Sequence, residues 1–406
     1  MNQPIPYGRQ HITDEDIAAV NDVLRSPYLT QGPKIGEFEQ AFASYIGATY
    51  AVAIANGTAA LHLCCMALGV GPGTRVITTP ITFSASANCV RYCGGEVYFA
   101  DINSETALLD PKAVRSLLES HPTGYFSGII PVDFAGYPVD MIQFRELADE
   151  FGLWIIEDAC HAPGATFTSN TGTDTSDRTY RGPTYRCGDG ALADLAIFSF
   201  HPVKHIAAGE GGMITTNDEV LYKHLLRLRT HGITNKPDEF TTPYDGEPER
   251  GGWYMEMQEL GYNYRLTDMQ AALAMSQLSR ADAMLARRQE LAARYDSAFS
   301  EAAANGLPIQ IIVPPAGVGH AYHLYVIQTP NRKALYDFLR TKNILAQVHY
   351  IPVHLMPYYR QFGWKPGDFP NAETYYAQCL SLPLFPTLTN EEQDYVIENV
   401  KTFLKS

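Results

Sequence analysis

The chain has 406 residues, 46% hydrophobic and 18% charged, with a formal net charge of −14. This length predicts one large and one smaller domain, and the acidic balance disfavours general nucleic-acid binding, which relies on clustered Lys and Arg. No apolar run approaches the roughly 20 residues of a membrane span, and MNQPIPYGRQ lacks the basic-then-apolar pattern of a signal peptide. We therefore expect no nucleic-acid or membrane partner.

The cysteines favour a reducing compartment. There are seven, an odd number, and none forms a CxxC pair. This pattern is typical of buried free thiols and not of a disulfide framework or a zinc site. We expect a cytoplasmic protein with no metal site.

The first half of the chain alternates strand-like and helical patterns. Thr13 and Asp16 form a capping-box pattern before a helix over 17–26, and a second helix is expected over 35–47. Nearly unbroken apolar runs then alternate with helical segments, which predicts an α/β fold with a mainly parallel sheet covered by helices. The predicted strands lie within 50–56, 75–80, 96–102, 127–134 and 153–159.

The second half is less regular. The polar stretch at 165–187 predicts an exposed loop or hairpin, and the one at 234–252 predicts a long surface loop. A helical pattern runs from 267 to 299 and is expected to lead into a smaller C-terminal α+β domain, so we place the domains at 1–270 and 271–406. The expected elements of that second domain are strands within 323–330 and 344–351 and helices over 332–343 and 390–404.

One lysine follows a strand end on a short turn. In FSFHPVKHIAAGEGGMITT, Ser199 ends an apolar strand and Lys204 follows it. An amine there is placed to form a Schiff base with a carbonyl cofactor, and the Ser199 hydroxyl could hold that cofactor's phosphate. A lysine in this position is more often a solvated surface charge, so this segment alone does not establish a Schiff-base lysine.

A carboxylate ends another apolar strand. Asp158 closes the run LWIIED, where a buried charge is costly without a cationic partner. The ring nitrogen of pyridoxal 5′-phosphate (PLP) is such a partner, and an ionised Asp keeps it protonated. A helix N-cap explains an Asp here equally well.

A third strand end offers an anion site. The strand ending at Asn56 is followed by Gly57, Thr58 and Ala59, small residues that open a helix. Backbone N–H groups and the helix dipole there favour a phosphate, although an ordinary strand-to-helix turn has the same pattern. The amine, the carboxylate and the anion site are all expected at one edge of the sheet. The chain contains no GxGxxG fingerprint after the first strand, no GxxxxGK[ST] and no GxSxG, which disfavours dehydrogenases, P-loop NTPases and α/β-hydrolases.

An ordered set of motifs resembles the DegT/DnrJ-type PLP-dependent sugar-nucleotide aminotransferases. The set is TQGP (30–33), NGTAALHL (56–63), TPITFSASAN (79–88), EDACHA (157–162), SFHPVK (199–204), EGG (210–212) and LGYNYRLTDMQAAL (260–273). The resemblance covers nearly the whole chain and implies PLP fold type I, the aspartate-aminotransferase-like fold. IPYGRQ, SFHPVK, VHYIPVHLMPYYR and GDFPNAETYY are similar to the family branch that acts in pseudaminic acid biosynthesis.

The resemblance implies roles for individual residues. Lys204 would carry the Schiff base and Asp158 would pair with the ring nitrogen. The other cofactor contacts implied are Phe83 stacked on the ring, Thr58, Ala59 and Ser199 at the phosphate, His161 near the ring hydroxyl, and Asn263 reaching a neighbouring subunit's phosphate. Candidate substrate contacts are Tyr7, Arg265, His349, Tyr350 and His354.

The resemblance also implies a reaction and partners. It implies amino transfer from L-glutamate to the C4 keto group of a UDP-linked 4-keto-6-deoxy-N-acetyl sugar, by a homodimer with shared active sites. A 3-keto sugar aminotransferase and a PLP-dependent sugar dehydratase remain alternatives. Some dehydratases replace the lysine by histidine, and His201 and His205 flank Lys204. A non-catalytic sugar-nucleotide sensor would have no need for an intact set of Lys204, Asp158 and Ser199.

Overall fold

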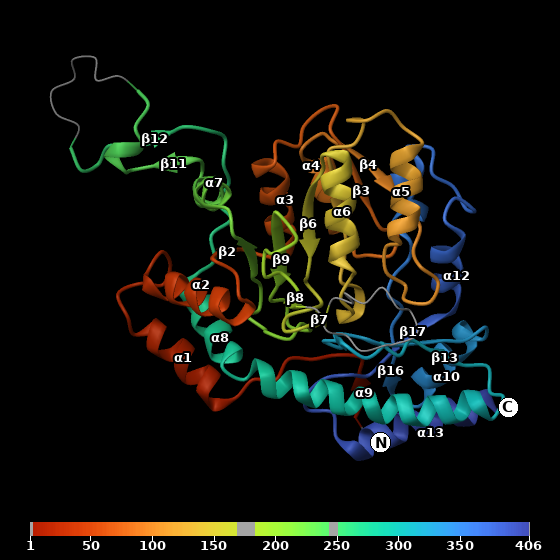
Figure 1. Cartoon of the computed structure of the whole chain (residues 1–406). Helices are drawn as coiled ribbons and strands as arrows, with labels where there is room; N and C mark the ends of the chain where they lie inside the picture. The colour runs from red at the N-terminus through yellow and green to blue at the C-terminus, as the bar shows by residue number, and fades with distance from the viewer. Residues whose placement is uncertain (1–2, 169–182, 243–250, 406) are drawn as a thin grey trace.

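The computed structural model describes residues 3–168, 183–242 and 251–405. Figure 1 shows a sheet flanked by helices, with one long helix running beneath it toward the C-terminal part of the chain. Within the described residues, no helix is both long enough and apolar enough to cross a bilayer.

A seven-stranded sheet forms the centre of the large domain, in the order β2-β10-β9-β6-β5-β3-β4. Its neighbouring strands are parallel except β10, which is antiparallel to both β2 and β9. The strands are almost wholly buried, as their unbroken apolar sequences predict. Their bounds are β2 Tyr50–Ile54, β3 Arg75–Thr78, β4 Glu96–Phe99, β5 Gly128–Ile130, β6 Trp154–Asp158, β9 Leu195–Ser199 and β10 Gly212–Thr216.

Helices pack against this sheet (Figure 1). α3 packs against α4 and α7, and α5 packs against α6. The predicted alternation of strands and helices is therefore confirmed. The helices are α3 Gly57–Ala67, α4 Ala85–Tyr92, α5 Pro111–Glu119, α6 Met141–Phe151 and α7 Glu219–Arg229, with a short 3-10 helix η1 at Phe134–Gly136.

The helix predicted over 267–299 is two helices, so that prediction is wrong in detail. α8 (Asp268–Leu278) ends before Ser279, and α9 (Ala281–Ala304) begins after Arg280, whose φ of −112° lies outside the helical range. α8 packs against the N-terminal helices α1 (Asp14–Leu24) and α2 (Pro33–Ile46), whereas α9 packs against β13 and α13 of the small domain. The break lets each half follow its own packing surface.

The buried Asp16 of α1 holds α1 against the C-terminal end of α8. Its carboxylate accepts hydrogen bonds from Ser276 Oγ, Gln277 Nε2 and Arg280 Nη2, each at 2.6 Å. Thr13 and Asp16 also form the predicted capping box at the start of α1. The boundary predicted after residue 270 falls inside α8 and stays a prediction.

The small domain is built on an antiparallel sheet in the order β13-β15-β17. The N-terminal strand β1 (Ile5–Pro6) pairs in parallel with β16 (Ile344–Leu345), so Ile5 packs in the core of this C-terminal unit. The remaining elements are β13 Gln310–Ile311, β15 Tyr325–Gln328, β17 Cys379–Leu382, α10 Arg332–Thr341, η3 Val353–Leu355, α11 Pro357–Arg360, α12 Pro370–Gln378 and α13 Asn390–Leu404.

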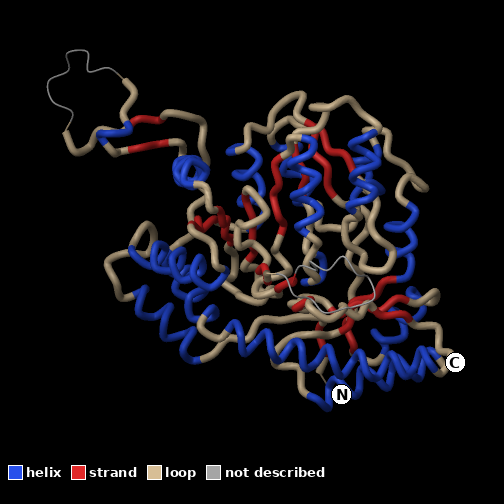
Figure 2. The backbone as a smooth tube through the Cα atoms, viewed as in Figure 1, coloured by secondary structure: helices blue, strands red, loops and turns tan. Residues whose placement is uncertain are grey.

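Two hairpins lie where the sequence predicts polar loops. β7 (Thr166–Thr168) pairs with β8 (Thr184–Arg186) and with β14 (Val318–Gly319). β11 (Ile233–Thr234) pairs with β12 (Glu256–Met257), next to a 3-10 helix η2 (Pro237–Glu239), and Figure 2 shows this hairpin projecting from the body of the molecule. The middles of both predicted loops, 169–182 and 243–250, lie outside the described residues.

Candidate active site

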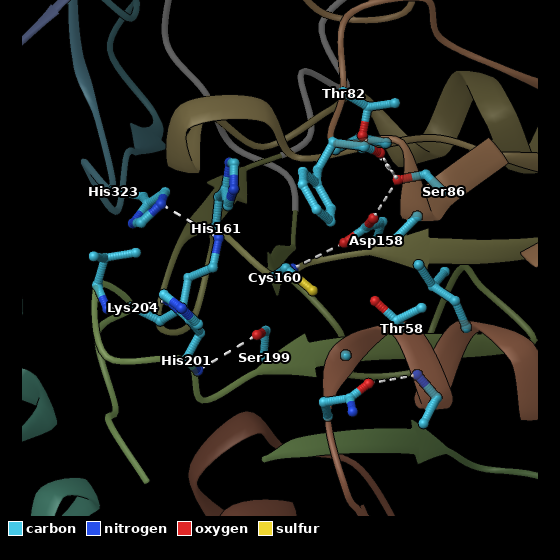
Figure 3. A pocket seen from close by; sticks show the side chains of 18 of the residues that line it. Thr58, Thr82, Ser86, Asp158, Cys160, His161, Ser199, His201, Lys204 and His323 are labelled. Atoms are coloured by element: carbon cyan, nitrogen blue, oxygen red, sulfur yellow. Dashed lines mark hydrogen bonds between the residues drawn. The ribbon is translucent and has the colours of Figure 1, made fainter. Parts of the chain in front are cut away.

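A cavity of about 660 Å³ opens at the carboxyl ends of β6 and β9 and the start of α3. Figure 3 shows Lys204 and His323 on one side of this cavity and Thr58 and Asp158 on the other. The three strand ends singled out from the sequence therefore meet in one place, as expected for an α/β sheet.

Lys204 is partly buried in the cavity wall and is not the fully solvated surface charge of the alternative interpretation. Burial lowers the pKa of its amine to about 8, and the nearby Arg288 acts in the same direction. Cys160 and Asp158 oppose this shift by favouring the charged form. Nζ lies 3.3 Å from His323 Nε2. An amine with this pKa exchanges protons readily near neutral pH.

Asp158 ends β6 inside the cavity and is only 5% exposed. Ser86 Oγ donates to its Oδ2 at 2.7 Å, and the Cys160 N–H donates to its Oδ1 at 3.2 Å. Both contacts orient the carboxylate. It bears no helix-capping role, because the residues after it form a turn.

The start of α3 is shaped to approach an anion. Asn56 is the N-cap, and its Oδ1 accepts from the Ala59 N–H at 2.8 Å, so the cap is Asn56 and not Thr58. A Cβ on Gly57 would lie 3.1 Å from Ser199 Cβ and 3.3 Å from Cys160 Sγ. A side chain at this position would crowd the end of β9, and its neighbours would have to give by a few tenths of an ångström.

An aromatic side chain is left exposed within the cavity. Phe83 is 59% exposed, although it lines the cavity with buried neighbours. Its ring centroid lies 6.2 Å from that of Tyr350. A large apolar ring that is not packed into the core is available to stack on a planar group.

His161 is buried beside Lys204 as a neutral ring. The Ala135 N–H donates to its Nδ1 at 3.2 Å, so the ring proton is on Nε2, which faces the Tyr350 hydroxyl at 3.4 Å. Burial, with the positive charge of Lys204, lowers the pKa of His161 well below its usual range. The ring can therefore donate a hydrogen bond into the cavity.

The small domain supplies another wall of the cavity. Tyr7, His349 and Tyr350 all line it. His349 Nδ1 lies 2.8 Å from Ser381 Oγ, which fixes the ring, and its pKa is lowered to about 3 by burial first and by Lys204 second.

Three predicted residues lie outside this cavity. His354 is wholly buried and its Nε2 lies 3.1 Å from Glu373 Oε1. Arg265 borders a separate cavity of about 280 Å³ that Glu39 and Arg229 also line. Asn263 is exposed, next to Thr230 in an isolated bridge.

The family model for the DegT/DnrJ/EryC1/StrS aminotransferases matches residues 10–401. The chain belongs to that family. It is 39% identical to the spore coat polysaccharide biosynthesis protein SpsC of Bacillus subtilis (strain 168), covering 100% of this chain and 98% of the relative. It is 36% identical to the uncharacterized protein MJ1066 of Methanocaldococcus jannaschii, covering 98% and 97% respectively.

Solved structures of sugar aminotransferases have the same fold. The PLP form of the putative sugar aminotransferase Spr1654 from Streptococcus pneumoniae has a TM-score of 0.84 at 29% identity, with 99% of each chain covered. PseC of Helicobacter pylori, an aminotransferase of pseudaminic acid biosynthesis, has a TM-score of 0.83 at 28% identity, covering 99% of this chain and 100% of that chain. The predicted family, fold type and aminotransferase class are confirmed, and the PLP and PMP forms of Spr1654 agree with the predicted cofactor.

The residues of this aminotransferase site fit PLP. A buried carboxylate faces the cavity without a cationic hydrogen-bond partner among the described residues, and a buried amine lies across from it. The glycine-opened helix start suits a phosphate, and the exposed Phe83 ring suits a planar ring. Asp158, Lys204, Phe83 and Ser199 with the backbone at Thr58 and Ala59 would hold the group.

Sequence reasoning missed several residues of the site. Ser86 orients Asp158, Cys160 lies against Lys204 and Asp158, and His323 contacts Lys204. Ser86 lies within the TPITFSASAN motif and Cys160 within EDACHA, so those two motifs carried a usable signal. His323 opens a strand-like run in the other domain, and nothing in its local pattern marks it.

One buried cluster brings together side chains of metal-ligating type, and the expectation of no metal site stays a prediction. Asp133, Glu157 and Cys187 bring potential ligand atoms within 4.8 Å of one another. Burial raises the pKa of Asp133 to about 7 and that of Glu157 well above its usual range. The charge of Asp133 further disfavours ionisation of Glu157, so the folded state favours a protonated carboxyl group in this pair.

Proposed function

We propose that this aminotransferase uses PLP to transfer an amino group from L-glutamate to the C4 keto group of a UDP-linked 4-keto-6-deoxy-N-acetyl sugar. The product would be UDP-4-amino-4,6-dideoxy-N-acetyl-β-L-altrosamine, a 4-amino sugar nucleotide for a surface glycan. The observation that carries the transfer chemistry is the single cavity joining a buried amine of pKa about 8, a buried carboxylate and an open helix start. PseC and SpsC, named for pseudaminic acid and for a spore coat polysaccharide, support a sugar as acceptor.

Each residue has a defined task in this reaction. When bound, PLP supplies a carbonyl that carries the amino group and a ring that accepts electrons. Asp158 keeps a proton on the ring nitrogen by its negative charge, with Ser86 holding the carboxylate in place. Lys204 in its neutral form takes the proton from the glutamate Cα and later returns a proton to the sugar carbon.

The cavity is large enough for more than an amino acid. Its volume of about 660 Å³ lies within the range of sites for drug-sized ligands. Tyr7, His349 and Tyr350 offer hydroxyl and imidazole groups that suit the hydroxyls of a sugar ring. We assign substrate contact to these three first, and to Arg265 and His354 only if subunits or domains move on binding.

We further propose a homodimer with shared sites. Asn263 is exposed and lies outside this chain's own cavity, which supports a role toward a second copy. Exposed apolar side chains on the nearby segment, including Met257, Leu260 and Tyr262, support a covered surface there. A cytoplasmic location stays a prediction from the free cysteines.

The experiment is transfer of isotopic nitrogen. The purified protein with PLP is incubated with ¹⁵N-L-glutamate and the UDP-linked 4-keto sugar, and the sugar nucleotide is analysed by mass spectrometry and NMR. The proposal expects 2-oxoglutarate and ¹⁵N bonded to C4. Nitrogen at C3 from a 3-keto sugar, or loss of a hydroxyl without nitrogen incorporation, would replace it with the 3-aminotransferase or dehydratase alternative.

A further inference from the structure

The Lys204 amine contacts a histidine from the other domain. His323 Nε2 lies 3.3 Å from Nζ, and in the described part of the chain it is the hydrogen-bond partner that the structure gives to this amine. His323 is 5% exposed and lines the cavity. Figure 3 shows the two side chains adjacent at one end of the cavity.

The backbone around His323 is held by the large domain. Its neighbour Leu324 donates its N–H to the Ala135 carbonyl at 3.1 Å. Ala321 donates its N–H to the Gly136 carbonyl at 2.8 Å. The imidazole is therefore presented to Lys204 from a segment fixed on both sides, which is the support that a positioned polar group needs.

Four histidines of the described residues lie near Lys204, namely His161, His205, His323 and His349. His161 and His205 have their ring protons fixed. His161 Nδ1 accepts from the Ala135 N–H, which places its proton on Nε2. His205 Nε2 lies 2.8 Å from the Ala321 carbonyl oxygen, which requires the proton on Nε2 as well. His323 Nδ1 has no hydrogen-bond partner among the described residues. Among the four, His323 is the histidine whose Nε2 lies within hydrogen-bond distance of Lys204 Nζ. Its ring is free to carry the proton on Nδ1 and to offer a bare Nε2 to the lysine.

The charges around the pair keep His323 neutral. Burial lowers the pKa of His323 well below its usual range, and the basic groups facing it act in the same direction. Those groups are Lys204, His161, His205 and Arg288. Lys204 itself faces Cys160, Asp158 and Arg288, and its charge also acts on His161 and His349. The lysine, and not the imidazole, therefore holds the proton that the pair can carry.

We propose that His323 is a positioning residue that accepts a hydrogen bond from Lys204 Nζ, in the amine form and more strongly in the ammonium form. An ammonium group offers three donors and no acceptor, so only a bare ring nitrogen can bind it. The charge-assisted bond stabilises the lysine after it has taken up a proton. This raises the basicity of an amine that burial alone would weaken. The inference deepens the proposed role of Lys204 as the base.

The test is the pKa of Lys204 in the full chain, measured without turnover. Protein treated with hydroxylamine to remove any bound carbonyl compound is labelled with trace acetic anhydride across the pH range around 8, and Lys204 acetylation is quantified by peptide mass spectrometry. For His323→Phe, which keeps a ring but no nitrogen, we expect the Lys204 pKa to fall by about one unit, the loss of one charge-assisted bond. For His323→Gln, whose carbonyl can accept, we expect less than half of that shift.

The controls separate this role from packing. His320→Gln changes a buried histidine on the same segment that does not contact Lys204, and it should leave the Lys204 pKa unchanged. If His323→Phe does not fold, His323→Leu takes its place, with thermal unfolding as the check. An unchanged Lys204 pKa in the Phe or Leu variant, or an equal shift in the Gln variant, overturns the proposal. Because labelling needs no transfer activity, failure of the proposed reaction would leave this result interpretable.

Discussion

The two walls of the cavity differ in how the chain builds them. The sheet wall consists of three strand ends, at Asn56, Asp158 and Ser199, that meet because β2, β9 and β6 run in the same direction and end at one edge of the sheet. The small-domain wall consists of Tyr7, His323, His349 and Tyr350, which come from segments far apart in the sequence. In the proposed reaction, the sheet wall holds the general transfer chemistry, whereas the small-domain wall is proposed to adjust the lysine and to select the substrate.

Removing the lysine should have the largest effect. Lys204→Ala removes the buried amine that moves the proton, so both the glutamate and the sugar half of the reaction should fall by at least about 10³-fold. Each half is measured in a single turnover. Loss confined to one half would show that another group serves as the base in the other half.

The next largest effect is expected at the carboxylate. Asp158→Asn keeps the shape and can still meet Ser86, but it removes the charge that protonates the ring nitrogen. We expect kcat to fall by about 10²–10³-fold for both halves, the usual cost of removing one electrostatic contact from an active site. Ser86→Ala, which leaves the charge in place, is the matched control and should cost less.

The helix start gives a smaller effect, on binding. Gly57→Ala would place a Cβ 3.1 Å from Ser199 Cβ, so Ser199 or the start of α3 must give by a few tenths of an ångström. We expect PLP affinity to fall by about tenfold, from overpacking of roughly 1–3 kcal/mol. Equilibrium dialysis with PLP measures this affinity. An unchanged affinity would show that the start of α3 does not form part of the phosphate site.

The small-domain wall should respond differently. Tyr350→Phe removes a hydroxyl that lies 3.4 Å from His161 Nε2 and leaves the ring beside Phe83. We expect kcat/KM for the keto sugar to fall by about tenfold, the value of one hydrogen bond, with the glutamate half little changed. Equal losses of kcat/KM in the glutamate and sugar half reactions would show that the two walls do not have separate roles.

The smallest effect concerns stability and pH. The folded-state pKa values of Asp133 and Glu157 are raised, so the folded protein binds protons more tightly than the unfolded chain. The contribution of these two groups to the free energy of unfolding is therefore fully present below the ordinary carboxyl pKa of about 4. It declines as pH rises toward about 7, by up to roughly 1.4 kcal/mol per pH unit for each proton.

Glu157→Gln tests that pair, because the amide can donate to Asp133 without titrating. Denaturant unfolding between acidic and neutral pH should show a flatter pH dependence for the variant than for the native chain. Identical slopes would mean that the two carboxylates are not a proton-sharing pair.

Local pattern predicted the sheet wall because each of its residues follows an unbroken apolar strand. Lys204, Asp158 and Gly57 could be found this way, and only their burial needed the structure. The small-domain wall could not be derived from local pattern: His323 opens an ordinary strand-like run, and its contact with Lys204 depends on packing between domains. His354 shows the converse, since a histidine in a recognisable motif lies outside the cavity against Glu373.

The break between α8 and α9 was missed for a related reason. Residues 267–299 contain no Gly or Pro, so the helical pattern runs on without interruption. The helix ends because Ser276, Gln277 and Arg280 converge on the buried Asp16 from the N-terminal helix. That constraint comes from tertiary packing, which local propensity does not contain.

The most direct test of the central claim is the visible spectrum of the purified protein with PLP. The account predicts an absorption band that disappears when L-glutamate is added and returns only when the UDP-linked 4-keto sugar follows, with no such change in Lys204→Ala. A band that L-glutamate leaves unchanged, or that Lys204→Ala reproduces in full, would contradict amino transfer at this site.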